Sequence, residues 1–159
     1  MVFLVLMPKI KKPGILILFI AICLGAGGVG SIFTTSAIPT WYATLIKPSF
    51  SPPNWIFAPV WTILYILMGI SAYLIRKSSV LRLFWIHLVV NVLWSYLFFG
   101  LRNPLYGLIC ILLLWGLIVA IIYRFYRIDK LAAWLLYPYL AWVTFAAFLN
   151  YNIWILNTP

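Results

Sequence analysis

Residues 104–123 read PLYGLICILLLWGLIVAIIY, a run that contains no charged side chain. A helix of about 20 mostly apolar residues is long enough to cross the hydrocarbon core of a bilayer. Four further apolar runs flank it in the chain, over residues 14–37, 55–75, 81–100 and 131–156. The sequence therefore predicts an all-α integral membrane protein, a single bundle of five transmembrane helices over 14–159 with an N-terminal tail over 1–13.

The composition excludes several classes of protein. Only 8% of the 159 residues are charged, whereas a soluble domain carries about 25% because its surface must face water. Asp129 is the only acidic residue, so the chain lacks both paired carboxylates for acid–base catalysis and the intramembrane acid usual in proton-coupled transporters. Cys23, Cys110 and His87 have no metal-ligand spacing, and we expect no metal and no resident cofactor.

The net charge of +10 comes from short basic clusters between apolar runs, which favours membrane edges over nucleic-acid binding. If five helices alternate in direction, only Lys47 and Arg102 lie on the side opposite the N-terminus. The positive-inside rule then predicts a cytoplasmic N-terminus and an outside C-terminus, and we expect a bacterial cell membrane. The nine basic residues on the N-terminal side are Lys9, Lys11, Lys12, Arg76, Lys77, Arg82, Arg124, Arg127 and Lys130.

The first apolar run admits two interpretations. Lysines precede it, and its first apolar stretch ends at Ala26-Gly27-Gly28, a pattern that also fits a signal peptide. The length of the whole run favours a retained membrane span. Its glycines, at 25, 27, 28 and 30, do not form a phosphate-binding loop because no strand precedes them. Small residues at helical spacing instead predict close packing between membrane helices.

The longest connection, residues 38–54, reads IPTWYATLIKPSFSPPN and holds four prolines and three aromatic residues. Proline fixes φ near −65°, so this segment is stiff and cannot be helical throughout. A long ordered loop of this kind favours a lid over a binding site. An interfacial aromatic belt would also explain Trp41 and Tyr42, and that alternative stays open.

Polar side chains follow one face of the third predicted helix. His87, Asn91 and Ser95 are spaced at steps of four residues, which places them on the same side. Polar groups are costly in lipid, so we expect this face to point into the bundle. Hydrogen bonds between helices and contact with a ligand are both consistent with the pattern, and Asn91 lies nearest the membrane midplane.

Aromatic residues are more numerous than two interfacial belts require, with nine Trp, ten Tyr and eleven Phe. Trp61 and Tyr65 share a face of the second helix, and Trp142, Phe145 and Leu149 share one on the fifth. Such side chains suit a pocket for a flat conjugated ligand, although ordinary packing explains any single one. Pro138 lies inside the fifth run, where we expect a kink in one continuous helix.

Several of these segments together resemble one family. WYATLIKPSFSPPNW at 41–55, PVWTILYILMG at 59–69, NVLWSYLFFG at 91–100, PYLAW at 138–142 and LNY at 149–151 are similar to the TspO/MBR family of tryptophan-rich sensory proteins and translocator proteins. The resemblance covers nearly the whole chain in the same order. It implies a five-helix bundle, often a homodimer, that binds porphyrins such as protoporphyrin IX, haem, sterols and isoquinoline-type ligands beneath the first loop.

The resemblance also implies roles for particular residues. Tyr42, Pro48 and Trp55 would belong to the lid, and some bacterial relatives degrade protoporphyrin in light using tryptophans that match Trp61 and Trp142. The chain departs from the cholesterol-recognition pattern of animal members, because Ile155 stands where that pattern has a basic residue. Together with the helix faces above and these three lid residues, the expected ligand-binding residues are Trp41, Trp61, Tyr65, His87, Asn91, Trp94, Trp142, Phe145 and Ala146.

Three functions follow as hypotheses. The leading one is a membrane receptor or sensor that binds tetrapyrroles and regulates their handling. The second is light-dependent protoporphyrin degradation in the same pocket. The third is transport of a tetrapyrrole or sterol, which the missing intramembrane carboxylate disfavours in its ion-coupled form but not as passive movement.

Overall fold

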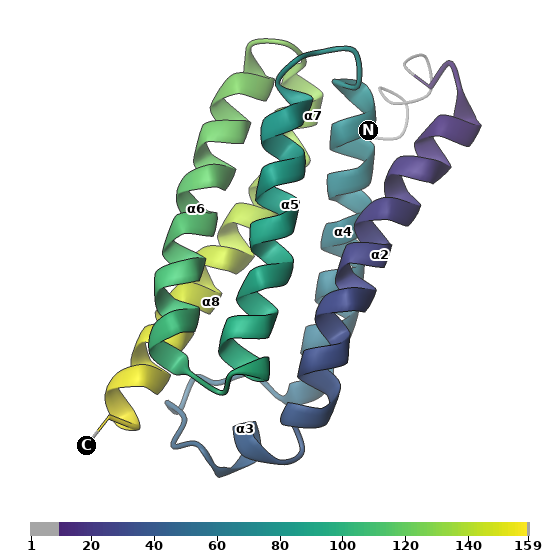
Figure 1. Ribbon diagram of the computed structural model, residues 1–159. Coiled ribbons are helices and arrows are strands. Elements are labelled where there is room, and N and C mark those ends of the chain that lie inside the picture. Colours follow the sequence, from purple (N-terminus) through teal and green to yellow (C-terminus); the bar gives the residue numbers. More distant parts are fainter. Residues whose placement is uncertain (1–9, 159) are drawn as a thin grey trace.

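The computed structural model describes residues 10–158, and all the regular elements in that range are helical. Residues 1–9, which include most of the expected tail and Lys9, lie outside the described residues. Figure 1 shows the elements as one bundle. They are α2 (Pro13–Ala37), α3 (Trp41–Thr44), η2 (Asn54–Ile56), α4 (Phe57–Leu74), α5 (Leu81–Ser95), η3 (Tyr96–Gly100), α6 (Pro104–Tyr126), α7 (Lys130–Trp134) and α8 (Tyr137–Leu156).

Five helical spans of this part of the chain are long and apolar enough to cross a membrane, as the hydropathy pattern predicts. Their directions alternate, so the α4–α5 turn, the α6–α7 turn and the start of α2 lie at one end of the bundle (Figure 1). The first loop and the end of α8 lie at the other end. The chain is an integral, multi-pass membrane protein.

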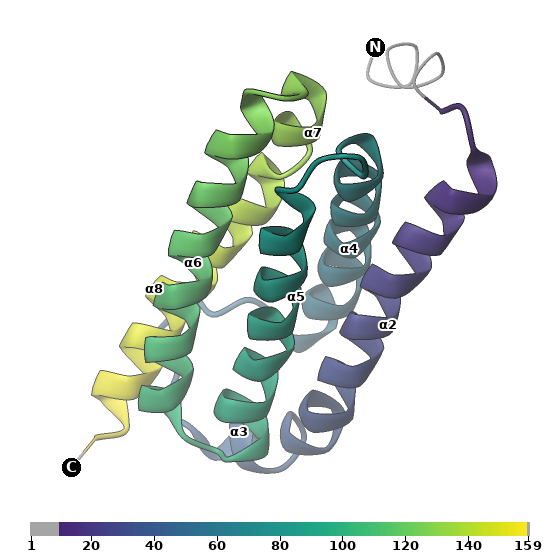
Figure 2. The same cartoon turned by 45° about the horizontal axis from the view of Figure 1, so that its top comes forward.

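The helices form a ring in which α2 contacts α4 and α5, and α6 contacts α5, α7 and α8. α2 is inclined to α5 rather than parallel to it (Figure 2). Where α2 crosses α4, a Cβ at Gly69 would lie 2.6 Å from the Cα of Ile20. Only a residue without a side chain permits this approach, which brings two membrane helices into direct backbone contact.

Two helices begin at side-chain caps in the short turns. Asn103 Oδ1 accepts hydrogen bonds from the amides of Leu105 and Tyr106, each at 3.1 Å, before Pro104 starts α6. Asp129 accepts from the amide of Leu131 at 2.9 Å and so caps α7. The only carboxylate side chain of the chain therefore serves a helix terminus at the membrane edge.

Local helix geometry differs from the sequence prediction at two places. The fifth span is interrupted by a turn at Leu135 and Leu136, and Pro138 lies in the first turn of α8. The expected kink within one continuous helix is thus wrong, because a helix that restarts before proline leaves no bond for the missing N–H to break. The third span ends in a π-helical turn, closed by Leu101 N–H donating to Tyr96 O at 2.8 Å.

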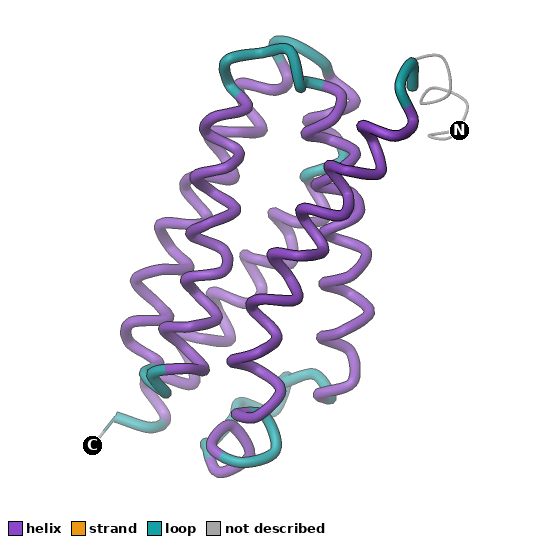
Figure 3. Tube along the Cα trace, turned by 45° about the vertical axis from the view of Figure 1, so that its right-hand side comes forward, coloured by secondary structure: helices purple, strands orange, loops and turns teal. Residues whose placement is uncertain are grey.

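The loop over residues 38–54 folds across the end of the bundle and contains α3 (Figure 3). Asn157, beyond α8, fastens it: its Oδ1 accepts from the Ile46 amide and its Nδ2 donates to Ile46 O, both at 2.9 Å. Phe50 stacks on Phe148 at 5.3 Å between ring centroids. The expected ordered loop is confirmed, and it contains one short α-helix.

Tyr42 anchors the middle of the same loop. Its side chain is 2% exposed and packs against the rings of Phe98 and Phe99, while Lys47 Nζ lies 4.6 Å from its ring centroid. Burial raises the pKa of the Tyr42 hydroxyl, and a hydrogen bond with Ser51 offsets part of that rise. The loop is therefore held by a buried aromatic residue as well as by hydrogen bonds.

Candidate ligand cavity

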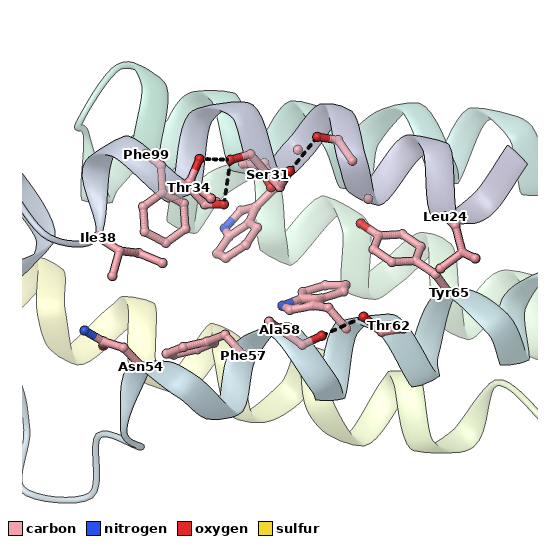
Figure 4. A pocket seen from close by; sticks show the side chains of 17 residues that line it. Leu24, Ser31, Thr34, Ile38, Asn54, Phe57, Ala58, Thr62, Tyr65 and Phe99 are labelled. Atoms are coloured by element: carbon pink, nitrogen blue, oxygen red, sulfur yellow. Dashed lines mark hydrogen bonds between the residues drawn. The ribbon is translucent and has the colours of Figure 1, made fainter. Parts of the chain in front are cut away.

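A cavity of about 370 Å³ lies between α2, α4 and the third span, and we call it the main cavity. It runs along the half of the bundle that the first loop covers, as the close view in Figure 4 shows. Its lining is mostly apolar and comes from Leu24, Gly27, Gly28, Gly30, Ser31, Thr34, Thr35 and Ile38 on one side and from Asn54, Phe57, Ala58, Trp61, Thr62, Tyr65, Trp94, Ser95 and Phe99 on the other.

Aromatic rings form one wall of the main cavity. The indoles of Trp61 and Trp94 lie nearly parallel, with 29° between their planes and 6.4 Å between their centroids. Tyr65 lies 5.6 Å from Trp61, and Phe98 stacks behind Trp94 at 5.7 Å. The wall therefore presents flat apolar faces from two different helices.

Glycines of α2 make room for this wall. A Cβ at Gly27 would overlap the ring of Tyr65, and one at Gly30 would lie 3.1 Å from Ser95 Oγ. Gly25 and Gly28, in contrast, have nothing within 4 Å of an added Cβ. Two of the glycines thus permit contact with α4 and α5, whereas the other two do not have that role.

A chain of buried hydrogen bonds begins at Tyr65. Its hydroxyl donates to Asn91 Oδ1 at 2.6 Å, and Asn91 Nδ2 donates to the Tyr139 hydroxyl at 2.9 Å. His87 Nδ1 lies 2.9 Å from Phe84 O, and His87 Nε2 lies 3.2 Å from the Tyr139 hydroxyl. A carbonyl oxygen only accepts, so Nδ1 carries the proton and Tyr139 donates to Nε2.

A second cavity of about 400 Å³ lies between α4 and α8, lined by Val60, Ile63, Leu64, Pro138, Ala141, Trp142 and Phe145. Trp142 Nε1 is the only buried side-chain nitrogen or oxygen of the described residues that has no hydrogen-bond partner. Phe57 lines the main cavity and packs edge-on against Trp142 at 6.1 Å. The two cavities lie on different faces of α4, because Phe57, Ala58, Trp61, Thr62 and Tyr65 line the main cavity while Val60, Ile63 and Leu64 line the second.

The residues expected to line one ligand pocket lie at different places in the structure. Trp61, Tyr65 and Trp94 meet at the main cavity, whereas Trp142 and Phe145 line the second. The structure therefore does not bring Trp61 and Trp142 to one cavity. Asn91 and His87 are buried in the hydrogen-bond chain and line neither cavity.

The remaining expected residues lie away from both cavities. Trp41 packs on Phe98 at 5.5 Å, and Ala146 packs against the core. Pro48 lies in the loop, and Trp55 is 73% exposed in η2. Neither Trp41 nor any of the lid candidates Tyr42, Pro48 and Trp55 lines the main cavity.

The polar residues of α2 were not singled out from the sequence. Ser31, Thr34 and Thr35 line the main cavity, within the segment GSIFTTSA at 30–37. A cluster of hydroxyl residues at the end of an apolar run was the available signal. Among the described residues, no group of three His, Cys, Asp or Glu side chains is placed to hold a metal ion.

Known proteins match this chain over most of its length. The model of the TspO/MBR family matches residues 19–155. The tryptophan-rich protein TspO of Chlorobaculum tepidum is 46% identical over 150 residues, which cover 89% of this chain and 95% of the relative. The translocator protein of Homo sapiens is 41% identical, covering 79% and 80%, and the tryptophan-rich sensory protein of Cereibacter sphaeroides is 33% identical, covering 87% and 89%. This five-span membrane chain belongs to the TspO/MBR family.

Proposed function

We propose that the protein is a membrane receptor or sensor that binds a porphyrin, protoporphyrin IX or haem, in the main cavity. Relatives named as a sensory protein and a translocator protein support the receptor part of this proposal. The observation that carries the ligand part is the pair of nearly parallel indoles, Trp61 and Trp94, on the cavity wall. A flat conjugated ring is the shape that such a wall complements.

The volume of the main cavity and the strength of aromatic contacts both agree with binding of a flat small molecule. Ligand cavities usually measure about 300–1,000 Å³ and are mostly apolar with a few polar groups. The main cavity, at about 370 Å³, falls in this range at its lower end, and its open side leaves room for a larger ring system. Each aromatic pair contributes about 0.5–1.5 kcal/mol beyond simple burial, so two indoles contribute a substantial part of the binding free energy.

The test is a titration of the purified protein in nanodiscs with protoporphyrin IX in the dark, followed by porphyrin absorbance. Trp61→Leu should weaken binding by about tenfold, because stacking and apolar contact are both reduced. Trp134→Leu is the control, since Trp134 is 64% exposed on α7 and lines neither cavity. Unchanged affinity in a folded Trp61→Leu protein would place the ligand elsewhere.

Light-dependent degradation of the bound porphyrin is a second candidate function, favoured by the position of Trp61 on the cavity wall. Indole is more easily oxidised than the phenyl ring, whereas phenylalanine preserves most of the apolar surface. Trp61→Phe should therefore keep dark binding and lose light-dependent bleaching. Wild-type bleaching at matched occupancy would exclude a chemical role for this indole.

Trp142 gives a separate readout of the same reaction. It lines the second cavity and not the main one, so Trp142→Phe should leave bleaching in the main cavity nearly unchanged. Equal loss of bleaching in both variants would instead show that the reacting porphyrin reaches both indoles. The homodimer and the bacterial membrane that the sequence suggests stay predictions.

A further inference from the structure

The α2 side of the main cavity carries hydroxyl groups that already donate their protons to backbone carbonyl oxygens. Ser31 Oγ donates to Gly28 O at 2.7 Å, Thr34 Oγ1 donates to Ser31 O at 3.2 Å, and Thr35 Oγ1 donates to the same oxygen at 2.7 Å. A hydroxyl has one proton and two lone pairs. These three side chains, the hydroxyl wall, line the cavity and therefore offer it only acceptors.

The facing side repeats the pattern and adds donors. Thr62 Oγ1 donates to Ala58 O at 2.8 Å, so it also offers lone pairs. The indole N–H of Trp61, the amide of Asn54 and the hydroxyl of Ser95 can donate to an occupant, because all three side chains line the cavity. The cavity thus offers acceptors on α2 and at Thr62, and donors at Trp61 and Asn54 and at Ser95, which lies beside Gly30 of α2.

Charge is absent from this lining. None of the residues that line the main cavity is Lys, Arg, His, Asp or Glu, although the chain has a net charge of +10. A carboxylate moved from water into such a site would lose its hydration without gaining a cation, which is costly. A neutral carboxylic acid needs only an acceptor for its O–H and a donor for its C=O, and both are present.

We propose that the main cavity admits a carboxyl group of its ligand as the neutral acid, with the acid O–H donating to the hydroxyl wall. This inference rests on the proposed binding of a porphyrin, whose propionic acid side chains supply the carboxyl group. The cavity then discriminates between protonation states of one ligand. It selects the uncharged form that also dissolves in the bilayer.

Binding of the neutral acid alone makes affinity depend on pH, and no protein group near the cavity would give the same dependence. Tyr65 is the only Tyr, His, Lys, Arg, Asp or Glu in the lining, and its hydroxyl donates to Asn91 Oδ1. Cys23 of α2 and His87 of α5 are buried and do not line the cavity, and Lys47 lies over Tyr42 in the loop. Carboxylic acids ordinarily titrate near about 4.

The experiment compares protoporphyrin IX with its dimethyl ester, which has the same ring but no titratable carboxyl group. Dark binding to the protein in nanodiscs is measured from about pH 5.5 to 8, with empty nanodiscs correcting for partition into lipid. The affinity of the acid should fall about tenfold per pH unit, because one proton is required for binding. The affinity of the ester should stay flat, and this comparison removes any pH effect that comes from the protein.

A matched set of variants tests the hydroxyl wall itself. The triple variant Ser31→Ala, Thr34→Val, Thr35→Val should weaken acid binding at low pH by about tenfold and leave ester binding unchanged. Thr40→Val is the control, because Thr40 Oγ1 donates to Ser36 O in the same way but does not line the cavity. Thermal unfolding of each variant checks that the bundle is intact.

The outcomes separate the two proposals. Tight acid binding that does not change with pH, or equal loss of acid and ester binding in the triple variant, would overturn the neutral-acid inference while porphyrin binding stands. Failure of both the acid and the ester to bind at any pH would overturn the proposed function and the inference together. Weakening of the acid alone by the triple variant, with Thr40→Val unchanged, is the expected result.

Discussion

At the scale of residues, a single contact sets the direction of a whole hydrogen-bond chain. Because His87 Nδ1–H donates to Phe84 O, Tyr139 must donate to His87 Nε2, and its oxygen is left to accept from Asn91. Tyr65 stands at the open end of the chain and only donates to Asn91. The two tyrosines are therefore unequal, since Tyr139 has two buried partners and Tyr65 has one.

This inequality makes a prediction about stability. Tyr139→Phe leaves both His87 Nε2 and Asn91 Nδ2 without their partner, whereas Tyr65→Phe leaves only Asn91 Oδ1 unpaired. Each unpaired buried group costs about 1–3 kcal/mol, so Tyr139→Phe should lower the free energy of unfolding about twice as much. Reversible unfolding in mixed micelles measures both, and an equal effect would show that the chain is not continuous.

Two glycines of α2 give a second prediction at this scale. Gly27→Ala places a methyl group against the Tyr65 ring, so we expect a loss of about 1–3 kcal/mol in stability. Gly25→Ala is the matched control, because an added Cβ there meets nothing within 4 Å and alanine favours helix. Thermal unfolding should separate the two; equal midpoints would mean that Tyr65 moves aside without cost.

Single residues were predictable where a periodic pattern existed. The spacing of His87, Asn91 and Ser95 correctly indicates the inward face, and the structure gives hydrogen bonds between helices for the first two. The hydroxyl wall was not predictable in the same way, since a hydroxyl in an apolar helix bonds its own backbone whether or not it borders a cavity. The separate positions of Trp61 and Trp142 depend on which face of α4 packs against α8, and no local pattern specifies that packing.

At the scale of elements, hydropathy predicts where a span lies but not how its helix is built. The five runs agree with the structure to within a few residues, because bilayer thickness fixes their length. The turn before Pro138 and the π-helical turn at 96–100 depend on packing against neighbouring helices. The π-helical turn carries Phe98 and Phe99, which contact the buried Tyr42 of the loop.

The fastening of the first loop can be tested directly. Asn157→Ala removes both hydrogen bonds to Ile46, so the Ile46 amide should exchange its proton with solvent much faster. If the loop is a lid, porphyrin affinity should fall as well, because a preorganised cover is lost. Asn152→Ala is the control, since Asn152 bonds only Phe148 O on its own helix. Unchanged exchange at Ile46 would show that Phe50 and Tyr42 hold the loop alone.

At the scale of the whole molecule, charge is concentrated at one end. Eight basic residues of the described chain border the turns at the end of the bundle where α2 begins, and only Lys47 and Arg102 lie at the opposite end (Figure 1). The alternating spans that this distribution requires are the ones the structure contains. The sidedness relative to the cell stays a prediction of the positive-inside rule.

That prediction has a simple measurement. With the N-terminus cytoplasmic and the C-terminus outside, a C-terminal fusion to a reporter that works only in the cytoplasm should be silent in a bacterial inner membrane. A fusion in the α4–α5 turn, after Lys77, should be active because that turn lies at the opposite end of the bundle. Strong activity of the C-terminal fusion would reverse the assignment.

The bond between Ile46 and Asn157 joins positions 111 residues apart, at the two extremes of the spans. A ribosome makes the first loop early, at about 5–20 residues per second, but Asn157 only after all five spans. The hydrogen bonds between Asn157 and the first loop therefore cannot form until α8 has been made and has reached the same end of the bundle. Until then the loop is held by contacts with earlier spans, such as those of Tyr42 with Phe98 and Phe99, because Phe50 also waits for Phe148 of α8. Attachment of the first loop to the bundle is therefore among the last steps of synthesis.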